Sequence, residues 1–365
     1  MGGIANYIFE LVRHLPARRL RVIALPSLGA EQFDSKQQFT IDRIGMPIAA
    51  SASSPLFKFL APIYFFYLLK SNENDILLCD CAHHSLMLPV WCLSKIRRVT
   101  FGVFSHGTDL LRHQGKFYTK VYNKLLRSAN YLFSNSQKTA EILLCLGVAK
   151  KKIRIIHPPV NTSKLRTRVC KRHILNCYNL HGKRIILTVG RLIERKGIDR
   201  VIAALPLVLK AVPNAHYMVV GIGPYEEHLR SMVNDLGLQS SVTFAGFVED
   251  DQLGAYYGVS DLFVMVSREF NGNRDIEGFG IVFLEANWFG IPVVAGKGGG
   301  TADAVIHGIT GLHVNPNSTE EVAGSIIQLL KNDRLATQLG QIGKERVVRE
   351  FSGSVAARKV LAAIS

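Results

Sequence analysis

Two glutamates are the residues of this sequence whose type and spacing most clearly suggest chemistry. Glu277 and Glu285 stand eight residues apart, at the two ends of the segment EGFGIVFLE. The glycine-rich start of this segment predicts a loop that ends at Gly280, and the apolar run Ile281–Phe289 predicts a buried helix. A carboxylate that is buried without a partner is costly, so Glu285 must bond either protein donors or the hydroxyls of a ligand. The two carboxylates could therefore serve one elongated ligand.

Three cations form a second candidate site. Arg191, Arg195 and Lys196 follow a predicted strand and precede the helix predicted over Asp199–Ala211. The dipole of a helix disfavours each cation at its start by about 0.3–1 kcal/mol. A bound anion such as a phosphate would compensate that cost. The alternative interpretation is a solvated charged turn that Glu194 screens.

Short β-branched runs alternate with longer helical stretches along the chain, a pattern typical of α/β proteins with parallel sheets. A first series of predicted strands comprises Leu20–Leu25, Asp75–Cys79, Val99–Phe104, Tyr131–Ser134 and Ile153–His157. A second series comprises Arg184–Gly190, Tyr217–Gly221, Val242–Gly246, Leu262–Val266, Pro292–Ala295 and Gly311–Val314. Helices are predicted, among others, over Lys116–Arg127, Asp199–Ala211 and Thr319–Lys331.

Residues 158–183 separate the two series of strands. This segment is basic, begins with Pro158-Pro159 and has little periodicity, which predicts an interdomain connection with a loose continuation. Two Rossmann-like domains that face each other across a cleft are therefore the predicted architecture.

The charge balance narrows the choice of partners. The chain has 44 Lys and Arg against 28 Asp and Glu, a net charge of +16. This excess favours phosphorylated substrates, acidic lipids or nucleic acid, and no DNA- or RNA-binding motif supports the last of these. The six cysteines lack the spacing of a metal site or a disulfide framework. They predict free thiols in a reducing cytoplasm and no structural metal.

The aromatic-rich stretch Pro55–Leu69 is too short to span a bilayer, which takes about 20 residues. It is interpreted either as a buried helix of the first domain or as an interfacial helix that enters one leaflet. Both interpretations remain open.

The E-x7-E segment occurs together with Gly2-Gly3, Gly190-Arg191, Lys196-Gly197 and Gly298-Gly-Gly300. In this combination the chain resembles, over nearly its whole length, the retaining family-4 glycosyltransferases of GT-B fold. The resemblance implies an acceptor-side domain over residues 1–158 and a nucleotide-sugar domain over residues 159–350. It also implies a C-terminal helix over residues 351–365 that returns to the first domain.

The resemblance also assigns roles to individual residues. Arg191 and Lys196 would hold the donor diphosphate and neutralise the leaving group, and Glu285 would bond the ribose hydroxyls. Glu277 would hold the donor sugar, and His106, in the segment SHGTD after a predicted strand, would lie beside the reacting sugar. The remaining donor-binding residues would contribute backbone groups: Gly3 from the opposite domain, Gly190, Gly278, Phe279 and Gly280.

The resulting expectation is a retaining hexosyltransferase at the cytoplasmic face of the plasma membrane. Mannose is the favoured sugar, with GDP-mannose ahead of a UDP-hexose as donor. The acceptor would be a lipid-linked saccharide or a surface polysaccharide, and an anionic membrane surface is a possible partner. No cofactor and no divalent metal is required by the sequence.

Three other kinds of protein are alternatives to this expectation. One is a catalytically silent relative that binds a nucleotide sugar or an acidic lipid, and another is a nucleotide-sugar epimerase of the same fold. A nicotinamide dehydrogenase needs a third glycine after Gly221-x-Gly223, and Glu226 stands there instead.

The family places a β-strand before the Gly-Gly loop, whereas here the helix predicted over Ile4–Leu15 begins almost at Met1. The expectation is therefore that this chain lacks the first strand of the N-terminal domain. We expect the native protein to carry about ten or more further residues that form this strand, the usual length of a strand with its turn.

Overall fold

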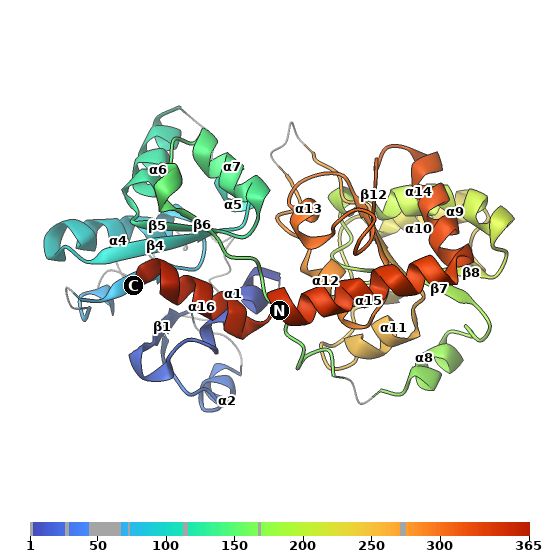
Figure 1. The fold of residues 1–365 in the computed structure, drawn as a ribbon, viewed down its shortest axis with the longest axis horizontal. Helices are drawn as coiled ribbons and strands as arrows, with labels where there is room; N and C mark the ends of the chain where they lie inside the picture. Colours follow the sequence, from blue (N-terminus) through green and yellow to red (C-terminus); the bar gives the residue numbers. More distant parts are fainter. Residues whose placement is uncertain are drawn as a thin grey trace. The chain divides into compact units, whose positions relative to one another are not determined.

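The computed structural model describes residues 3–25, 29–43, 67–71, 74–111, 116–166, 169–270 and 275–365 (Figure 1). The chain divides into two units, which we describe separately. Unit 1 comprises Met1–Pro159 together with Gly353–Ser365, and unit 2 comprises Val160–Ser352. The sequence places the corresponding boundaries at 158/159 and 350/351.

Unit 2 contains a six-stranded parallel sheet with the strand order β12-β11-β10-β7-β8-β9. Its strands are β7 (Arg184–Val189), β8 (Ala215–Val220), β9 (Val242–Gly246), β10 (Leu262–Met265), β11 (Val293–Gly296) and β12 (Leu312–Val314). The first strand of unit 2, β7, therefore lies inside the sheet beside β10, and the later strands extend to both sides. This reversal of strand order is the switch point at which ligands of such folds bind.

Helices cover both faces of this sheet. They are α8 (Lys171–Cys177), α9 (Ile198–Ala211), α10 (Glu226–Asp235), α11 (Leu253–Val259), α12 (Ile281–Trp288), α13 (Thr301–Ala304), α14 (Thr319–Lys331) and α15 (Asp333–Glu350), with a 3₁₀ turn η4 (Glu194–Lys196). Because side chains alternate along a strand, Ile186 and Val264 belong to one core with α9, α10 and α14. Leu187 and Phe263 belong to the other core with α8, α11 and α12.

The expectation of a loose segment over residues 158–183 is wrong in part, because α8 lies within it. This helix has only seven residues, of which Ile174 alone is buried. Ile174 packs in the core that α11 also lines. So short an amphipathic signal does not stand out from a basic sequence.

Unit 1 contains a four-stranded parallel sheet in the order β3-β4-β5-β6 and a separate parallel pair β1-β2. The strands are β1 (Arg21–Ala24), β2 (Thr40–Arg43), β3 (Ile76–Cys79), β4 (Thr100–Ser105), β5 (Tyr131–Ser134) and β6 (Ile153–Ile155). The sequence does not predict β2, since its four residues TIDR include two charged ones. An ion pair between Arg21 and Asp42 joins β2 to β1.

The helices of unit 1 are α1 (Gly3–Val12), α2 (Ala30–Asp34), α4 (His84–Arg97), α5 (Thr108–Leu111), α6 (Lys116–Ser128), α7 (Gln137–Cys145) and α16 (Gly353–Ile364), with the 3₁₀ turns η1 (Ala17–Arg19) and η3 (Lys150–Lys152). The first and last helices, blue and red in Figure 1, lie side by side. The contact is tight, because a Cβ atom on Gly353 would lie 2.7 Å from the carbonyl oxygen of Glu10.

Parallel sheets with helical connections in both units confirm the predicted α/β fold class. Each predicted strand matches an observed one to within a few residues. The predicted Gly2 site and most of Pro55–Leu69 lie outside the described residues, and Leu68 at the end of that stretch is buried. In the part of the chain that the structure describes, no helix has the length and apolar character needed to cross a membrane.

Candidate functional site

The predicted site residues of unit 2 lie in loops that leave the carboxyl ends of β7, β10 and β11. Arg191, Lys196 and their neighbours follow β7, and the loop that carries Glu277 follows β10. These two strands are neighbours at the switch point of the sheet. The topology therefore brings the two candidate sites of the sequence to one place.

The cations lie on a turn before α9, not within its first helical turn. Arg195 and Lys196 belong to η4, and Gly197 ends this turn with φ of 70°, in the left-handed region. A Cβ atom on Gly197 would lie 2.1 Å from the carbonyl oxygen of Val266, just beyond β10. Only glycine combines this backbone angle with so close an approach. Gly197 thereby seats the cationic turn against the end of β10.

Glu277 is the centre of the site, and its side chain accepts hydrogen bonds at the Oε2 atom. The Nη1 atom of Arg195 and the Nζ atom of Lys196 each donate to this oxygen at 2.7 Å. The hydroxyl of Ser267 donates to it at 3.3 Å. The Oε1 atom makes no hydrogen bond with the described residues, which leaves it available to a ligand.

The charge state of Glu277 follows from these contacts. Burial alone would raise the pKa of this carboxyl, which is only 9% exposed. Lys196 and Arg195 outweigh burial and lower the pKa from 4.5 to about 2. Glu277 is therefore ionised at any physiological pH, and it can accept hydrogen bonds but is a poor proton acceptor.

Arg195 is a site residue that the sequence analysis noted in the cation cluster but did not assign to the site. Besides Glu277, it contacts Asp275, with its Nε atom 3.0 Å from a carboxylate oxygen. Arg191, in contrast, is exposed, and its side chain makes no hydrogen bond or ion pair with the described residues. Its neighbour Gly190 donates its N–H to the carbonyl of Val220 at 2.9 Å, which fixes the start of the loop.

The glycine segments hold the Glu277 loop in place. The N–H of Gly300 donates to the carbonyl of Glu277 at 2.7 Å. A Cβ atom on Gly299, which has φ of 60°, would lie 2.2 Å from the same carbonyl oxygen. Gly280, with φ of 92°, is the residue before α12. The Phe279 side chain packs in the core beside Phe351, so Phe279 could contribute only backbone groups to a ligand.

Glu285 lies on α12 and receives a hydrogen bond from the hydroxyl of Tyr257 on α11, at 2.8 Å to its Oε2 atom. Burial raises the pKa of Glu285, and the Tyr257 bond opposes this effect. The requirement for a partner is thus met by a protein donor. The Oε1 atom makes no hydrogen bond with the described residues, and it could also accept one from a ligand.

His106 belongs to unit 1, where it follows β4. It is 5% exposed, and its Nε2 atom donates to the carbonyl of Asp80 at 2.7 Å. The Asp109 carboxylate accepts the N–H groups of His106 and Ala82, at 2.9 and 3.0 Å, and so ties the loops after β3 and β4 together. The rings of Tyr7 and His106 pack edge to face, with their centroids 5.6 Å apart. The imidazole is held firmly by its own unit.

Gly3, the other predicted residue of unit 1, is exposed and is the first residue of α1. The structure thus brings Lys196 and Glu277 into direct contact. It places Arg191, Gly278 and Gly280 in loops at the same edge of the unit 2 sheet, and Glu285 on the helix α12 that follows one of these loops. The roles of all these residues toward a donor stay predictions.

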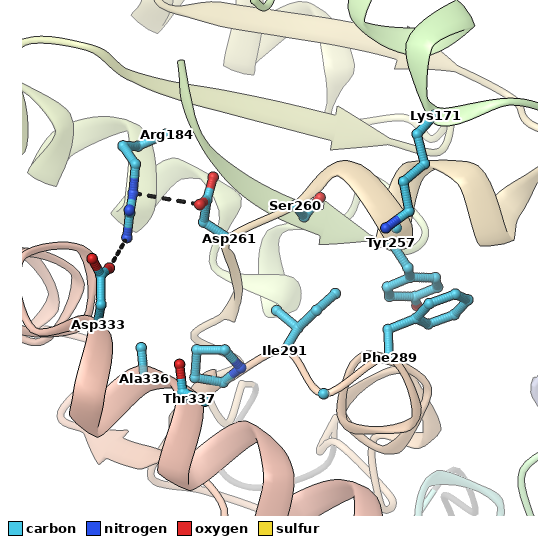
Figure 2. A pocket seen from close by; sticks show the side chains of 13 residues that line it. Lys171, Arg184, Tyr257, Ser260, Asp261, Phe289, Ile291, Asp333, Ala336 and Thr337 are labelled. Atoms are coloured by element: carbon cyan, nitrogen blue, oxygen red, sulfur yellow. Dashed lines mark hydrogen bonds and ion pairs between the residues drawn. The ribbon is translucent and has the colours of Figure 1, made fainter. Parts of the chain in front are cut away.

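A cavity of about 350 Å³ in unit 2 lies elsewhere, at the amino ends of β7, β10 and β11 (Figure 2). Three of its charged side chains pair with one another: Arg184 contacts Asp261 at 3.4 Å and Asp333 at 2.8 Å. None of the predicted site residues lines it. Within the described residues, no group of three or more His, Cys, Asp or Glu side chains could hold a metal ion.

Two family models match this chain. The model "Glycosyltransferase Family 4" matches residues 1–164, and "Glycosyl transferases group 1" matches residues 178–346. A GDP-mannose-dependent alpha-(1-6)-phosphatidylinositol monomannoside mannosyltransferase of Mycobacterium tuberculosis is 36% identical, over 98% of this chain and 93% of the relative. A monoacylated-substrate counterpart of Corynebacterium glutamicum is 35% identical over 47% of this chain and 44% of its own length.

Solved structures agree on the fold. The Anabaena protein Alr3699/HepE, solved in complex with UDP and glucose, has a TM-score of 0.80 at 19% identity and covers 100% of this chain and 96% of its own. Sucrose-phosphate synthase from Thermosynechococcus elongatus has a TM-score of 0.79 at 23% identity, with 100% and 94% covered. The ordered motifs, the fold and the near-complete match to a relative lead to one assignment: this chain belongs to the retaining family-4 glycosyltransferases of GT-B fold.

Proposed function

We propose that this glycosyltransferase moves mannose from GDP-mannose to a phosphoinositol-type lipid glycan at the cytoplasmic membrane face. The observation that carries the proposal is the pair of cations held on one oxygen of Glu277 while its other oxygen stays available. The names of the mycobacterial and corynebacterial relatives support the choice of donor and acceptor class.

The cations would stabilise the leaving group. As the bond between the sugar C1 and the diphosphate breaks, negative charge builds on the diphosphate, and fixed cations aimed at it lower the barrier. Lys196 keeps two N–H donors beyond the one that Glu277 accepts. Arg191 is exposed beside it and can approach the same anion. With this charge supplied by side chains, we propose that no divalent metal is needed.

The two carboxylates would orient the donor. Oε1 of Glu277 would accept hydrogen bonds from the sugar hydroxyls, and Oε1 of Glu285 would accept them from the ribose. Glu277, with a pKa of about 2, is too weak a base to remove the acceptor proton. In the proposed reaction the acceptor oxygen bonds C1 on the face from which the diphosphate leaves. Its proton passes to the departing phosphate oxygen.

Two apolar side chains offer a surface for the base. Ile222 and Phe247 follow the neighbouring strands β8 and β9 and are 54% and 64% exposed. A hydrogen bond of 2.8 Å from the N–H of Gly221 to the carbonyl of Gly246 joins the two loops. Apolar side chains that face water on adjoining loops can stack on a flat heterocycle. Neither residue belongs to a motif that stands out in the sequence.

The net charge of +16 suits both a phosphorylated acceptor and an anionic lipid surface. We therefore propose peripheral association with the membrane. Sedimentation with vesicles tests this part: anionic vesicles should retain the protein, and neutral ones should not. Equal, negligible binding to both would favour a soluble saccharide acceptor.

The function is tested by incubating the protein with radiolabelled GDP-mannose, UDP-glucose or UDP-galactose, with and without phosphatidylinositol mannoside in vesicles. We expect label to enter the lipid phase from GDP-mannose only. Transfer from a UDP-sugar would overturn the donor. Binding of GDP without transfer to any lipid or saccharide acceptor would identify a catalytically silent relative.

A further inference from the structure

Three consecutive residues after β10 reach three different loops of the site. The hydroxyl of Ser267 donates to Glu277, and Oε1 of Glu269 accepts the N–H of Gly299 at 3.0 Å. Between them, Arg268 turns toward the cationic turn η4. We refer to Ser267, Arg268 and Glu269 as the β10 hub. It lies at the switch point of the sheet, where all three loops converge.

The Arg268 side chain bonds residues on both sides of Lys196 in the sequence. Its Nη2 atom lies 3.2 Å from Oε1 of Glu194, the first residue of η4. Its Nη1 atom donates to Oδ2 of Asp199, in the first turn of α9, at 2.8 Å. Its backbone N–H donates to the carbonyl of Arg195 at 2.9 Å. Arg268 therefore holds the turn that carries Lys196 at three points along the chain: at its first residue, at Arg195 and at the start of α9.

The guanidinium of Arg268 is itself inaccessible to a ligand. The residue is 5% exposed, and the guanidinium carbon lies 5.0 Å from the centre of the Phe270 ring. Phe270 pairs with Asp275 through two backbone hydrogen bonds of 3.0 and 3.2 Å. Arg268 thus contacts both the η4 turn and the Phe270–Asp275 pair that leads to Glu277. Because it is buried, its guanidinium would not contact a bound ligand directly.

A buried ion cluster of this kind is weak evidence for stability, because apolar side chains of similar volume often stabilise a fold equally well. Directed hydrogen bonds, however, fix the angle of a turn more narrowly than apolar packing does. A misplacement of about 1 Å can lower a rate by about 100-fold. The cluster is therefore better explained by the geometry that it imposes than by the free energy that it contributes.

We propose that Arg268 is a positioning residue for glycosyl transfer, which holds the η4 turn so that Lys196 meets the leaving diphosphate. The proposal rests on the diphosphate role of Lys196 in the proposed function. Arg268 acts only through the turn, so its loss should reduce kcat more than it raises KM for the donor. Substitution of Arg268 should also have little effect on kcat in a variant that lacks the Lys196 side chain.

The test is a double-mutant cycle of Arg268→Met and Lys196→Ala, with kcat and KM measured on the donor that the parent protein uses. We expect Arg268→Met to lower kcat by about 10- to 100-fold in the parent, less than the about 10²- to 10³-fold for direct loss of one fixed charge contact, because Lys196 itself remains. In the Lys196→Ala background the same substitution should change kcat by less than about twofold. Equal effects in both backgrounds would overturn the positioning role.

The matched control is Arg184→Met, at the opposite edge of the same sheet, where one arginine also joins two aspartates (Figure 2). This variant should keep kcat within about twofold of the parent. If it loses as much kcat as Arg268→Met at equal folded fraction, the effect is general to the fold and the proposal fails.

If the Arg268→Met variant does not fold, the Arg268→Lys variant takes its place in the test. A single ammonium cannot make the forked contacts with both Glu194 and Asp199, so a folded Arg268→Lys variant should also lose kcat. Full activity of that variant would refute the proposal. Failure of the proposed function gives a different result, because Lys196→Ala alone would then match the parent whatever Arg268 does.

Discussion

Replacing Glu277 by glutamine should destabilise unit 2 by about 3 kcal/mol at neutral pH. The pKa of this carboxyl lies at about 2, against 4.5 ordinarily. Each tenfold change in an acid dissociation constant corresponds to about 1.36 kcal/mol, so the folded state favours the ionised form by about 3 kcal/mol. The amide cannot carry that charge, so Lys196 loses its ion pair and Arg195 keeps only the pair with Asp275.

The sign of the pH dependence is determined by the lowered pKa. The stabilisation is fully present above the unfolded-state value of 4.5 and is lost as pH falls toward about 2. At pH 3 the difference between parent and variant should therefore have shrunk to less than half of its value at pH 7.

Urea unfolding in a Trp91→Phe background measures this difference, because Trp288 on α12 is then the only tryptophan. The control Glu226→Gln removes a surface pair with Arg230, 2.8 Å apart on α10, and should cost less than about 0.5 kcal/mol. A Glu277→Gln variant as stable as the parent at pH 7, or a gap that is unchanged at pH 3, would refute the electrostatic reasoning.

Three further predictions concern binding and turnover. Arg191→Ala and Lys196→Ala should each lower turnover by about 10²- to 10³-fold, and parent-like rates in either variant would remove its diphosphate role. Glu285→Gln should weaken the affinity for free GDP, measured by calorimetry, more than Glu277→Ala does. The reason is that Glu285 is assigned to the ribose, which GDP contains, and Glu277 to the donor hexose, which GDP lacks. The opposite order would exchange the two roles. Phe247→Ala should weaken GDP binding by about 5- to 150-fold, which corresponds to a loss of about 1–3 kcal/mol of stacking on a base, and unchanged affinity by calorimetry would place the base elsewhere.

Local patterns in the sequence predicted the fold class and the chemical types of the site. β-Branched runs marked the strands, and the E-x7-E segment marked a loop followed by a buried helix. The cation cluster was recognised because positive charge before a helix calls for an anion. These features depend on neighbours within about ten residues, the range over which sequence periodicity carries information.

The contacts between the loops could not be predicted in the same way. Arg268 and Asp199 are far apart in the sequence, and only the adjacency of β7 and β10 brings them together. Likewise, no local pattern shows that Tyr257 satisfies Glu285, since the bond joins two helices. The strand β2 was missed because pairing with β1, rather than its own composition, makes it a strand.

The pairing of Arg195 and Lys196 with Glu277 and Asp275 has a consequence for how salt affects the protein. Two positive charges face two negative ones, so this part of the site is neutral as a whole before any nucleotide arrives. Added salt therefore has little long-range attraction to screen there. An approaching donor would sense mainly the exposed charge of Arg191. Donor affinity should then fall only gently with ionic strength, although the groups that meet the diphosphate at contact are strongly charged.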